Sequence, residues 1–273
     1  MFKRIGAALS KSVSLLQALC QRYSDNTKEQ NFSLILGGAV YVDEAVNRNP
    51  KALVASNAKI EIKKKLYVSR GGYKLEAAIK AFNIDCKDKI VLDAGASTGG
   101  FTDCLLQQGA KLVYSVDVGY NQLDYKLRVH PQVVVMERTN IKEITLLNPP
   151  CDFVVADLSF RSIVPVLPKL FSLSASGQII FLLKPQFEVD PKTLPDFDGV
   201  VREVGIIKNL LVDFFKAATN MGYFLSSLIA SPIKGTSGNR EFLVNLYSHK
   251  KAGFEFLDQD SYLKLISEIC NNI

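Results

Sequence analysis

The chain has 273 residues, of which 48% are hydrophobic and 22% charged, and its formal net charge is +6 at pH 7. This is the composition of a soluble globular protein with a substantial core. Its longest apolar runs, such as Ile179–Leu183, are far too short to cross a bilayer. No signal-peptide core follows Lys3 and Arg4, since Ser10 and Lys11 interrupt the apolar residues. We therefore expect a cytoplasmic protein with no membrane partner.

The cysteines and histidines argue against a disulfide framework and a metal site. The chain has no Cys-x-x-Cys pair, and its cysteines are dispersed at Cys20, Cys86, Cys104, Cys151 and Cys270. Such an odd, scattered set is typical of reduced thiols. Two isolated histidines, His130 and His249, do not make a metal site. We therefore expect no bound metal.

The positive charge is concentrated at the N-terminus. Residues 1–66 hold eleven Lys or Arg against five Asp or Glu, whereas the rest of the chain holds 22 of each. A basic module beside a neutral one indicates a domain that docks on a polyanion, joined to a working domain. A solvated basic face without a partner is the alternative interpretation.

The N-terminal region predicts a small module of mixed helix and strand. Two helices and two strands are expected at Leu15–Tyr23, Lys28–Leu36, Ala39–Val42 and Ile60–Ile62. Asp25–Asn26 supplies the turn between the helices, and Gly37–Gly38 ends the second one. We assign residues 1–62 to this small α+β domain and residues 63–68 to a charged linker.

From Ser69 onward, strands and helices alternate, which is typical of a mostly parallel, doubly wound α/β sheet. Five strands are expected at Ile90–Asp93, Leu112–Asp117, Val133–Met136, Phe153–Ala156 and Ile179–Leu183. Helices are expected at Lys74–Phe82, Phe101–Gln108, Leu123–Val129, Ile163–Phe171 and Gly205–Met221. Two late strands, Phe224–Ala230 and Glu241–Tyr247, should pair at the sheet edge. We assign residues 69–249 to this domain and residues 250–273 to a C-terminal helical extension with a helix at Ser261–Ile269.

A glycine-rich run, Gly95–Gly100, follows the first of these strands and precedes a helix. Glycines at this place let the backbone turn tightly around a ligand at a helix N-terminus. The dinucleotide pattern Gly-x-Gly-x-x-Gly would need a glycine at Ser97, so a dehydrogenase is disfavoured. The pattern Gly-x-Ser-x-Gly-Gly after Asp93 instead favours S-adenosylmethionine, with a purely structural turn as the alternative.

Ligands bind at the carboxyl ends of the strands in an open parallel sheet, so the residues there are site candidates. Asp117 ends the second strand, where a carboxylate can bind both ribose hydroxyls of an adenosine. Glu137–Asn140 ends the third strand, near the expected position of the adenine. The predicted cofactor-binding residues are Asp93, Gly95, Ala96, Ser97, Thr98, Gly99, Asp117, Val118, Asn140 and Asp157.

Four charged residues can share one rim of this sheet. Asp157 ends the fourth strand, and Lys184 ends the fifth, where burying an ammonium is costly without a partner. Lys74 opens the helix before the first strand, and Glu241 opens the last strand. Each alone is an ordinary surface charge, and Lys184 could simply extend to solvent.

These motifs resemble the TlyA family, which joins a small RNA-binding domain of the ribosomal-protein S-four type to an FtsJ-like, Rossmann-like class I methyltransferase domain. The resemblance covers roughly residues 10–247, and its blocks lie at 68–75, 93–102, 116–122 (VDVGYNQ), 137–140, 157–160, 184–188 and 231–241 (SPIKGTSGNRE). It implies methylation of ribose 2′-hydroxyls in ribosomal RNA, typically at cytidines, with S-adenosylmethionine as methyl donor. The Lys-Asp-Lys-Glu tetrad of FtsJ-like enzymes maps onto Lys74, Asp157, Lys184 and Glu241, which are therefore the predicted catalytic residues.

The tetrad has a plausible chemistry. A partly desolvated ammonium beside a second ammonium gives up its proton more readily, so we expect Lys184 to accept the proton of the 2′-hydroxyl. Asp157 would orient Lys184 and face the sulfonium. Lys74 and Glu241 would position Lys184 and the ribose, and alignment should supply much of the rate.

The resemblance is weaker at the N-terminus. Asp25–Asn26 stands where the family has Ser-Arg, and Asp43–Glu44 adds negative charge to an expected neutral turn. The predicted RNA-binding residues are Lys11, Arg22, Lys28, Arg48, Lys51 and Arg70. Two other functions stay open: a membrane-active haemolysin, a label this family often carries, and an RNA-binding protein without catalysis. We expect ribosomal subunits as partners and a monomeric chain.

Overall fold

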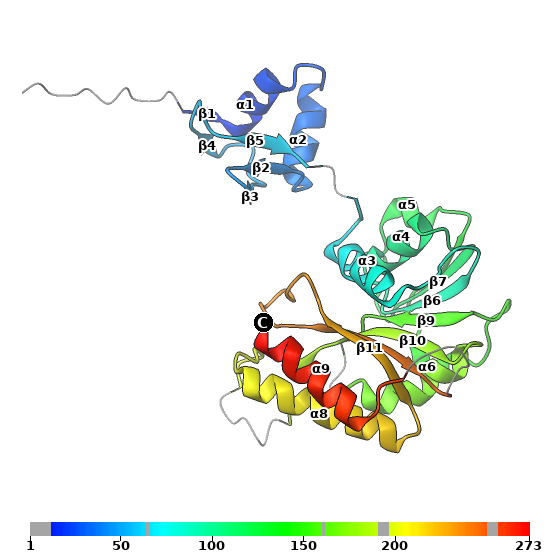
Figure 1. The fold of residues 1–273 in the computed structure, drawn as a ribbon. Helices are drawn as coiled ribbons and strands as arrows, with labels where there is room; N and C mark the ends of the chain where they lie inside the picture. The colour runs from blue at the N-terminus through cyan, green and yellow to red at the C-terminus, as the bar shows by residue number, and fades with distance from the viewer. Residues whose placement is uncertain (1–11, 64–65, 160–161, 191–196, 250–255) are drawn as a thin grey trace, which may run out of the picture. The chain divides into compact units, whose positions relative to one another are not determined.

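The computed structural model describes residues 12–63, 66–159, 162–190, 197–249 and 256–273 (Figure 1). The chain divides into two compact units, residues 1–66 and 67–273. None of the described helices is long and apolar enough to cross a membrane.

The first unit packs two helices against short antiparallel strands. Its elements are β1 (Val13–Ser14), α1 (Leu15–Arg22), α2 (Lys28–Leu36), β2 (Val40–Val42), β3 (Ala45–Val46), β4 (Leu53–Val54) and β5 (Ile60–Ile62). The strands form a three-stranded sheet in the order β3-β2-β5 and a separate pair, β1-β4. Thr27 begins α2 through a reciprocal capping box with Gln30. Leu15, Leu19 and Ile35 from the helices are fully buried in this unit's core.

The sequence anticipates both helices and the two longer strands of this unit. It misses β1, β3 and β4, which are two residues long each. Two residues carry no period-2 alternation, so only the pairing with a distant partner defines such a strand.

The second unit is built on one seven-stranded sheet. Its strands are β6 (Ile90–Ala94), β7 (Leu112–Val116), β8 (Val133–Met136), β9 (Phe153–Ala156), β10 (Gln178–Leu183), β11 (Phe224–Ala230) and β12 (Phe242–Tyr247). The order across the sheet is β11-β12-β10-β9-β6-β7-β8, with β6 to β10 parallel and the last two antiparallel. The predicted doubly wound α/β sheet is confirmed. The late strands do pair, but only β11 is an edge strand, because β12 inserts beside β10.

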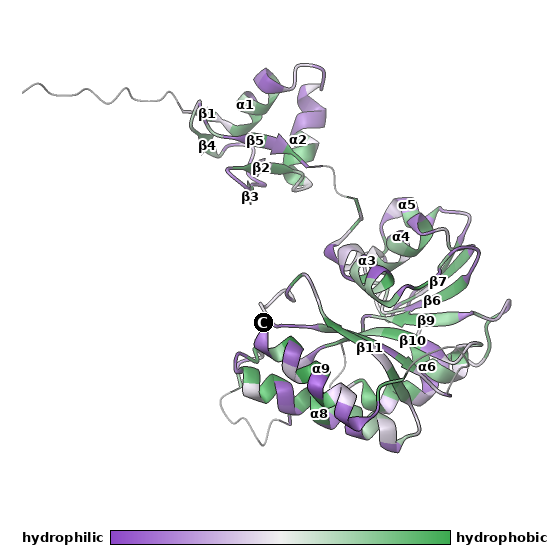
Figure 2. Ribbon diagram, in the orientation of Figure 1, coloured by the Kyte–Doolittle hydropathy of each residue, from purple (hydrophilic) through white to green (hydrophobic). Residues whose placement is uncertain are grey.

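Helices cover both faces of this sheet (Figure 1). They are α3 (Arg70–Phe82), α4 (Gly100–Gln107), α5 (Tyr125–Arg128), α6 (Leu167–Leu173), α7 (Pro185–Glu188), α8 (Val204–Asn220) and α9 (Gln259–Asn271), with 3₁₀ turns η1 (Ile141–Glu143) and η2 (Val164–Val166). Side chains of α3 and α4 pack on one face, and those of α6, α8 and α9 pack on the other. Figure 2 shows the hydrophobic colour concentrated on the strands between these layers.

Two helix boundaries differ from expectation and affect the site. Helix α3 begins at Arg70, one turn earlier than predicted, so Lys74 lies within the helix and faces the protein interior. Helix α5 is a single turn that begins at Tyr125, so the first two residues of the predicted helix belong to the preceding loop. The strand order reverses at β6, because β7 and β8 lie on one side of it and β9 and β10 on the other. The loops that follow β6 and its neighbours therefore diverge, and ligands bind between such loops in sheets of this kind.

Candidate active site

Two adjoining hollows lie at the carboxyl ends of the parallel strands. The larger has a volume of about 240 Å³ and is lined by residues that follow β6, β7, β8 and β9. The smaller, of about 110 Å³, lies between the glycine-rich turn and the start of α3. Gly95, Ser97 and Asp157 line both hollows, so these residues mark the junction between them.

The glycine-rich turn depends on glycine at two positions. Gly95 has a φ of +85°, and a Cβ there would lie 2.6 Å from the carbonyl oxygen of Asp157. Gly99 has a φ of +92°, and a Cβ there would lie 2.3 Å from the side chain of Leu127. Gly99, which precedes α4, has no side chain to cap the helix, and the N–H of Thr102 in the first turn is bonded to Asp93. The N–H groups of Gly100 and Phe101, which line the smaller hollow, are the ones suited to an anion.

Asp117 lines the larger hollow at the end of β7. One carboxylate oxygen accepts the N–H of Ser97 at 2.8 Å, and the other accepts the N–H of Gly119 at 2.7 Å. A carboxylate has about four acceptor positions, so each oxygen keeps one for a further donor. Two such oxygens held side by side match the two hydroxyls of a ribose.

Glu137 holds the loop that covers the far end of this hollow. It accepts a 2.7 Å hydrogen bond from Arg128 and the backbone N–H groups of Asn121, Gln122 and Leu123. These bonds, that of Arg128 first, lower the pKa of Glu137 to about 2. These bonds hold the backbone at residues 121–123, and Gln122 among them lines the hollow.

Three predicted cofactor residues do not line either hollow. Asn140 accepts the N–H of Lys142 and caps η1, while its neighbours Thr139 and Ile141 form the wall. Gly99 packs against α5. Four other residues from the predicted cofactor set do line the hollows, namely Ala96, Ser97, Thr98 and Val118.

Asp93 is the third of these residues and lies beneath the site. It is fully buried, and it accepts a 2.6 Å hydrogen bond from the hydroxyl of Thr102, which also contacts Ser115. Burial raises the pKa of Asp93 to about 7. Its side chain therefore ties the end of β6 to the first turn of α4 from inside the protein.

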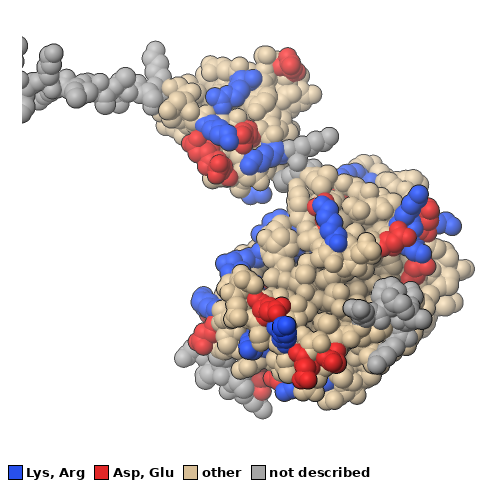
Figure 3. Space-filling view, in the orientation of Figure 1, with Lys and Arg blue, Asp and Glu red and all other residues tan. Residues whose placement is uncertain are grey.

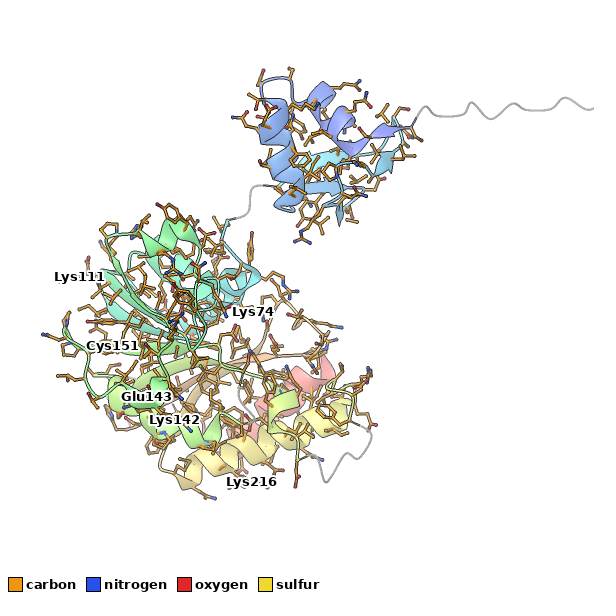
Figure 4. The ribbon with its side chains drawn as sticks, turned by 180° about the vertical axis from the view of Figure 1, so that it is seen from behind. Lys74, Lys111, Lys142, Glu143, Cys151 and Lys216 are labelled. Carbon is orange, nitrogen blue, oxygen red and sulfur yellow. The ribbon has the colours of Figure 1, made fainter. Side chains whose placement is uncertain are left out.

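The four predicted catalytic residues form two ion pairs. Lys74 Nζ lies 2.5 Å from Glu241 Oε2, and both side chains are buried. Lys184 Nζ lies 2.7 Å from Asp157 Oδ1 and 3.3 Å from the hydroxyl of Ser159. The side chain of Lys184 is only 12% exposed, so it does not extend to solvent. Figure 4 labels Lys74 on α3.

The sheet register brings the two pairs together. Leu183 of β10 is paired with Phe242 of antiparallel β12, and Lys184 and Glu241 are the next residues beyond this pair. Both ion pairs therefore lie at the edge of the sheet where the parallel strands end. Asp157 lines both hollows, whereas Lys74, Lys184 and Glu241 line neither.

The predicted RNA-binding residues differ in exposure and in what their side chains contact. Arg22 donates to the carbonyls of Ala58 and Ile60, so its guanidinium ties α1 to the region of β5. Lys28, Arg48 and Lys51 are exposed. The other two are Arg70, which is exposed and donates to Thr236 Oγ1 at 3.1 Å, and Lys11, which lies outside the described residues.

Charges of both signs are interspersed on the visible face of each unit (Figure 3). On β5 of the first unit, Glu61 lies between Lys59 and Lys63 and pairs with both. Lys59 and Lys63 are therefore neighbours of a carboxylate and not free positive charges on this sheet. Among the described residues, no group of three or more His, Cys, Asp or Glu could hold a metal ion.

Sequence reasoning missed several residues that line the hollows. They are Ser69, Gly71, Gly100, Phe101, Val116, Gln122, Thr139, Ile141, Leu158 and Ser159. All but Ile141 lie inside a motif that the sequence singled out. Listing whole strand-end segments, instead of single charged residues, would have found most of them.

Comparisons with known proteins agree on one family. The family described as FtsJ-like methyltransferase matches residues 67–247. YqxC of Bacillus subtilis, named as an rRNA methyltransferase, is 41% identical over 87% of this chain and 86% of its own. TlyA of Mycobacterium tuberculosis, named as a 16S/23S rRNA (cytidine-2′-O)-methyltransferase, is 38% identical over 83% of this chain and 86% of its own. A solved structure from Streptococcus thermophilus, named as a hemolysin, superposes with a TM-score of 0.70 at 34% identity and covers 96% of both chains.

Proposed function

The chain belongs to the FtsJ-like methyltransferase family, and from this premise we propose that it transfers a methyl group from S-adenosylmethionine to the ribose 2′-hydroxyl of a cytidine in ribosomal RNA. The observation that carries the proposal is the Lys184–Asp157 ion pair, whose Asp157 lines both hollows, together with the buried Lys74–Glu241 pair at the same edge of the sheet. Such a substrate also locates the reaction in the cytoplasm. The haemolysin alternative is supported only by names that relatives carry.

The two hollows fit the two ends of S-adenosylmethionine. Asp117 would bind the ribose hydroxyls in the larger hollow, against the wall formed by Thr139 and Ile141. The backbone N–H groups of Gly100 and Phe101 at the start of α4 would bind the methionine carboxylate in the smaller one. When bound, S-adenosylmethionine supplies an electrophilic methyl group on a sulfonium.

The chain's own residues would prepare the attacking hydroxyl. Lys184 Nζ lies against Asp157 and Ser159 in a partly dry site. After releasing its own proton to solvent, the Lys184 amine would take the hydroxyl proton, and Asp157 would stabilise the ammonium that forms. The Lys74–Glu241 pair lies at the same edge of the sheet and would position Lys184 and the ribose. Because all four side chains are already paired and largely buried, little reorganisation is needed on binding.

The proposal is tested with purified protein, tritiated S-adenosylmethionine and separated ribosomal subunits, followed by mapping of the label. We expect label on the 2′-oxygen of a cytidine in ribosomal RNA. Lys184→Met should keep S-adenosylmethionine binding and lose about 10²–10⁴-fold in rate. Label on a nucleobase, or no label despite tight cofactor binding, would contradict the proposal. Leakage of lipid vesicles caused by the pure protein would favour the haemolysin.

A further inference from the structure

Glu188 is a largely buried carboxylate that the chemistry above does not use. It is the last residue of α7, the single turn that follows Lys184. One of its oxygens accepts the hydroxyl of Ser162 at 2.6 Å, and the other accepts the N–H of Ile163 at 2.9 Å. Glu188 therefore connects the segment after β10 to the segment after β9.

These two segments are the ones that carry Lys184 and Asp157. They are joined twice, once by Lys184 to Asp157 and Ser159, and once by Glu188 to Ser162 and Ile163. The second connection uses no residue that the proposed chemistry uses. The hollow beside Glu188, which Leu158 and Phe187 help to line, has a volume of only about 10 Å³. It has room for about one water molecule at most.

Resting on the proposed function, we propose that Glu188 is a positioning residue for the methyl transfer. By holding Ser162 and Ile163, it fixes the segment that carries Asp157 relative to Lys184. A displacement of about 1 Å at a reacting group can cost about a hundredfold in rate, so a hydrogen-bonded brace one turn away matters for kcat. Burial raises the pKa of Glu188, in keeping with a group shielded from water.

Two substitutions of Glu188 distinguish a requirement for its hydrogen bonds from a requirement for its negative charge. Glu188→Ala removes both bonds, and we expect kcat to fall about 10–100-fold while the Kd for S-adenosylmethionine changes less than about twofold. Glu188→Gln can accept from Ile163 with its oxygen and donate to the Ser162 hydroxyl with its amide. We expect it to keep at least about half of the wild-type kcat, and Ser162→Ala to lie between. A Gln variant as slow as the Ala variant would overturn the proposal, because charge would then be the requirement.

A matched control is available at the other end of β9. Asp152 accepts the N–H of Ile90 at 2.8 Å, so Asp152→Ala also removes a carboxylate bond between strands, but away from the site. We expect this variant to lower the melting temperature and to leave kcat within about twofold of wild type. If Asp152→Ala slows kcat as much as Glu188→Ala at an equal loss of melting temperature, the inference fails. Full kcat in Glu188→Ala overturns it as well, whereas a wild-type protein that methylates no ribose overturns the proposed function.

Discussion

Lys74 and Glu241 are 167 residues apart in the chain, yet their buried side chains form a 2.5 Å ion pair. Helix α3 contributes the lysine and β12 contributes the glutamate. Each charge is buried with the other as its partner, so neither can be removed alone without leaving an uncompensated charge inside the protein.

The first prediction separates the stability of this pair from its use in catalysis. Lys74→Met should lower the free energy of unfolding by about 3–5 kcal/mol, because it strands the buried carboxylate of Glu241. The double variant Lys74→Met/Glu241→Leu should recover most of that loss but stay inactive. Urea unfolding and methyl transfer are measured in parallel. Recovery of activity together with stability would show that the pair is only structural.

The second prediction concerns the glycine-rich turn. Gly99→Ala combines an unfavourable φ of +92° with a clash at Leu127, whereas Gly222→Ala, at a φ of +82°, meets no atom within 4 Å. Both variants should lose about 1–2 kcal/mol from the backbone, and Gly99→Ala should lose about 1–3 kcal/mol more through overpacking. Only Gly99→Ala should weaken S-adenosylmethionine binding, as measured by calorimetry. Equal effects on binding would argue against a cradle at this turn.

The third prediction is a pH dependence from Asp93. Its pKa is raised by burial from 3.8 to about 7, so the native state favours the protonated form. The stabilisation is therefore fully present below pH 3.8 and is lost as the pH rises through about 7. Asp93→Asn has no carboxyl group to titrate. The difference between its free energy of unfolding and that of the wild type should therefore rise in the variant's favour between pH 4 and pH 7, by up to about 4 kcal/mol.

Urea unfolding of both proteins at several pH values measures this difference. Other titrating groups are common to the two proteins and cancel in the comparison. A difference that stays constant across this range would mean that Asp93 keeps its ordinary pKa.

The fourth prediction concerns RNA docking by the first unit. If Lys28, Arg48 and Lys51 contact phosphates, replacing all three by alanine should reduce the salt dependence of RNA affinity, by about 0.7–0.9 in the log–log slope per contact. Arg22→Ala should instead lower stability, because its guanidinium binds the carbonyls of Ala58 and Ile60. Affinities are measured by filter binding over a range of salt. An unchanged slope in the triple variant would place the docking surface elsewhere.

The sequence alone determined the architecture of the second unit and most of its site. Alternation of apolar strands with amphipathic helices predicts a parallel sheet, and parallel strands bring their carboxyl ends to one edge. Gly95, Asp117, Asp157 and Lys184 could therefore be placed from their positions at strand ends. These signals are local, because they depend on periodicity and turn chemistry within a few residues.

Only the tertiary structure decided which side chains line the two hollows and which are buried behind them. Asp93 and Asn140 also lie near strand ends, but neither lines a hollow. Asp93 is buried and bonded to Thr102, whereas Asn140 caps the turn η1. The insertion of β12 beside β10 brings Glu241 to the same edge of the sheet as Lys184, and the bonds of Glu188 join the segments that follow β9 and β10. These outcomes depend on long-range pairing and on the packing around each side chain, which one-dimensional periodicity does not encode.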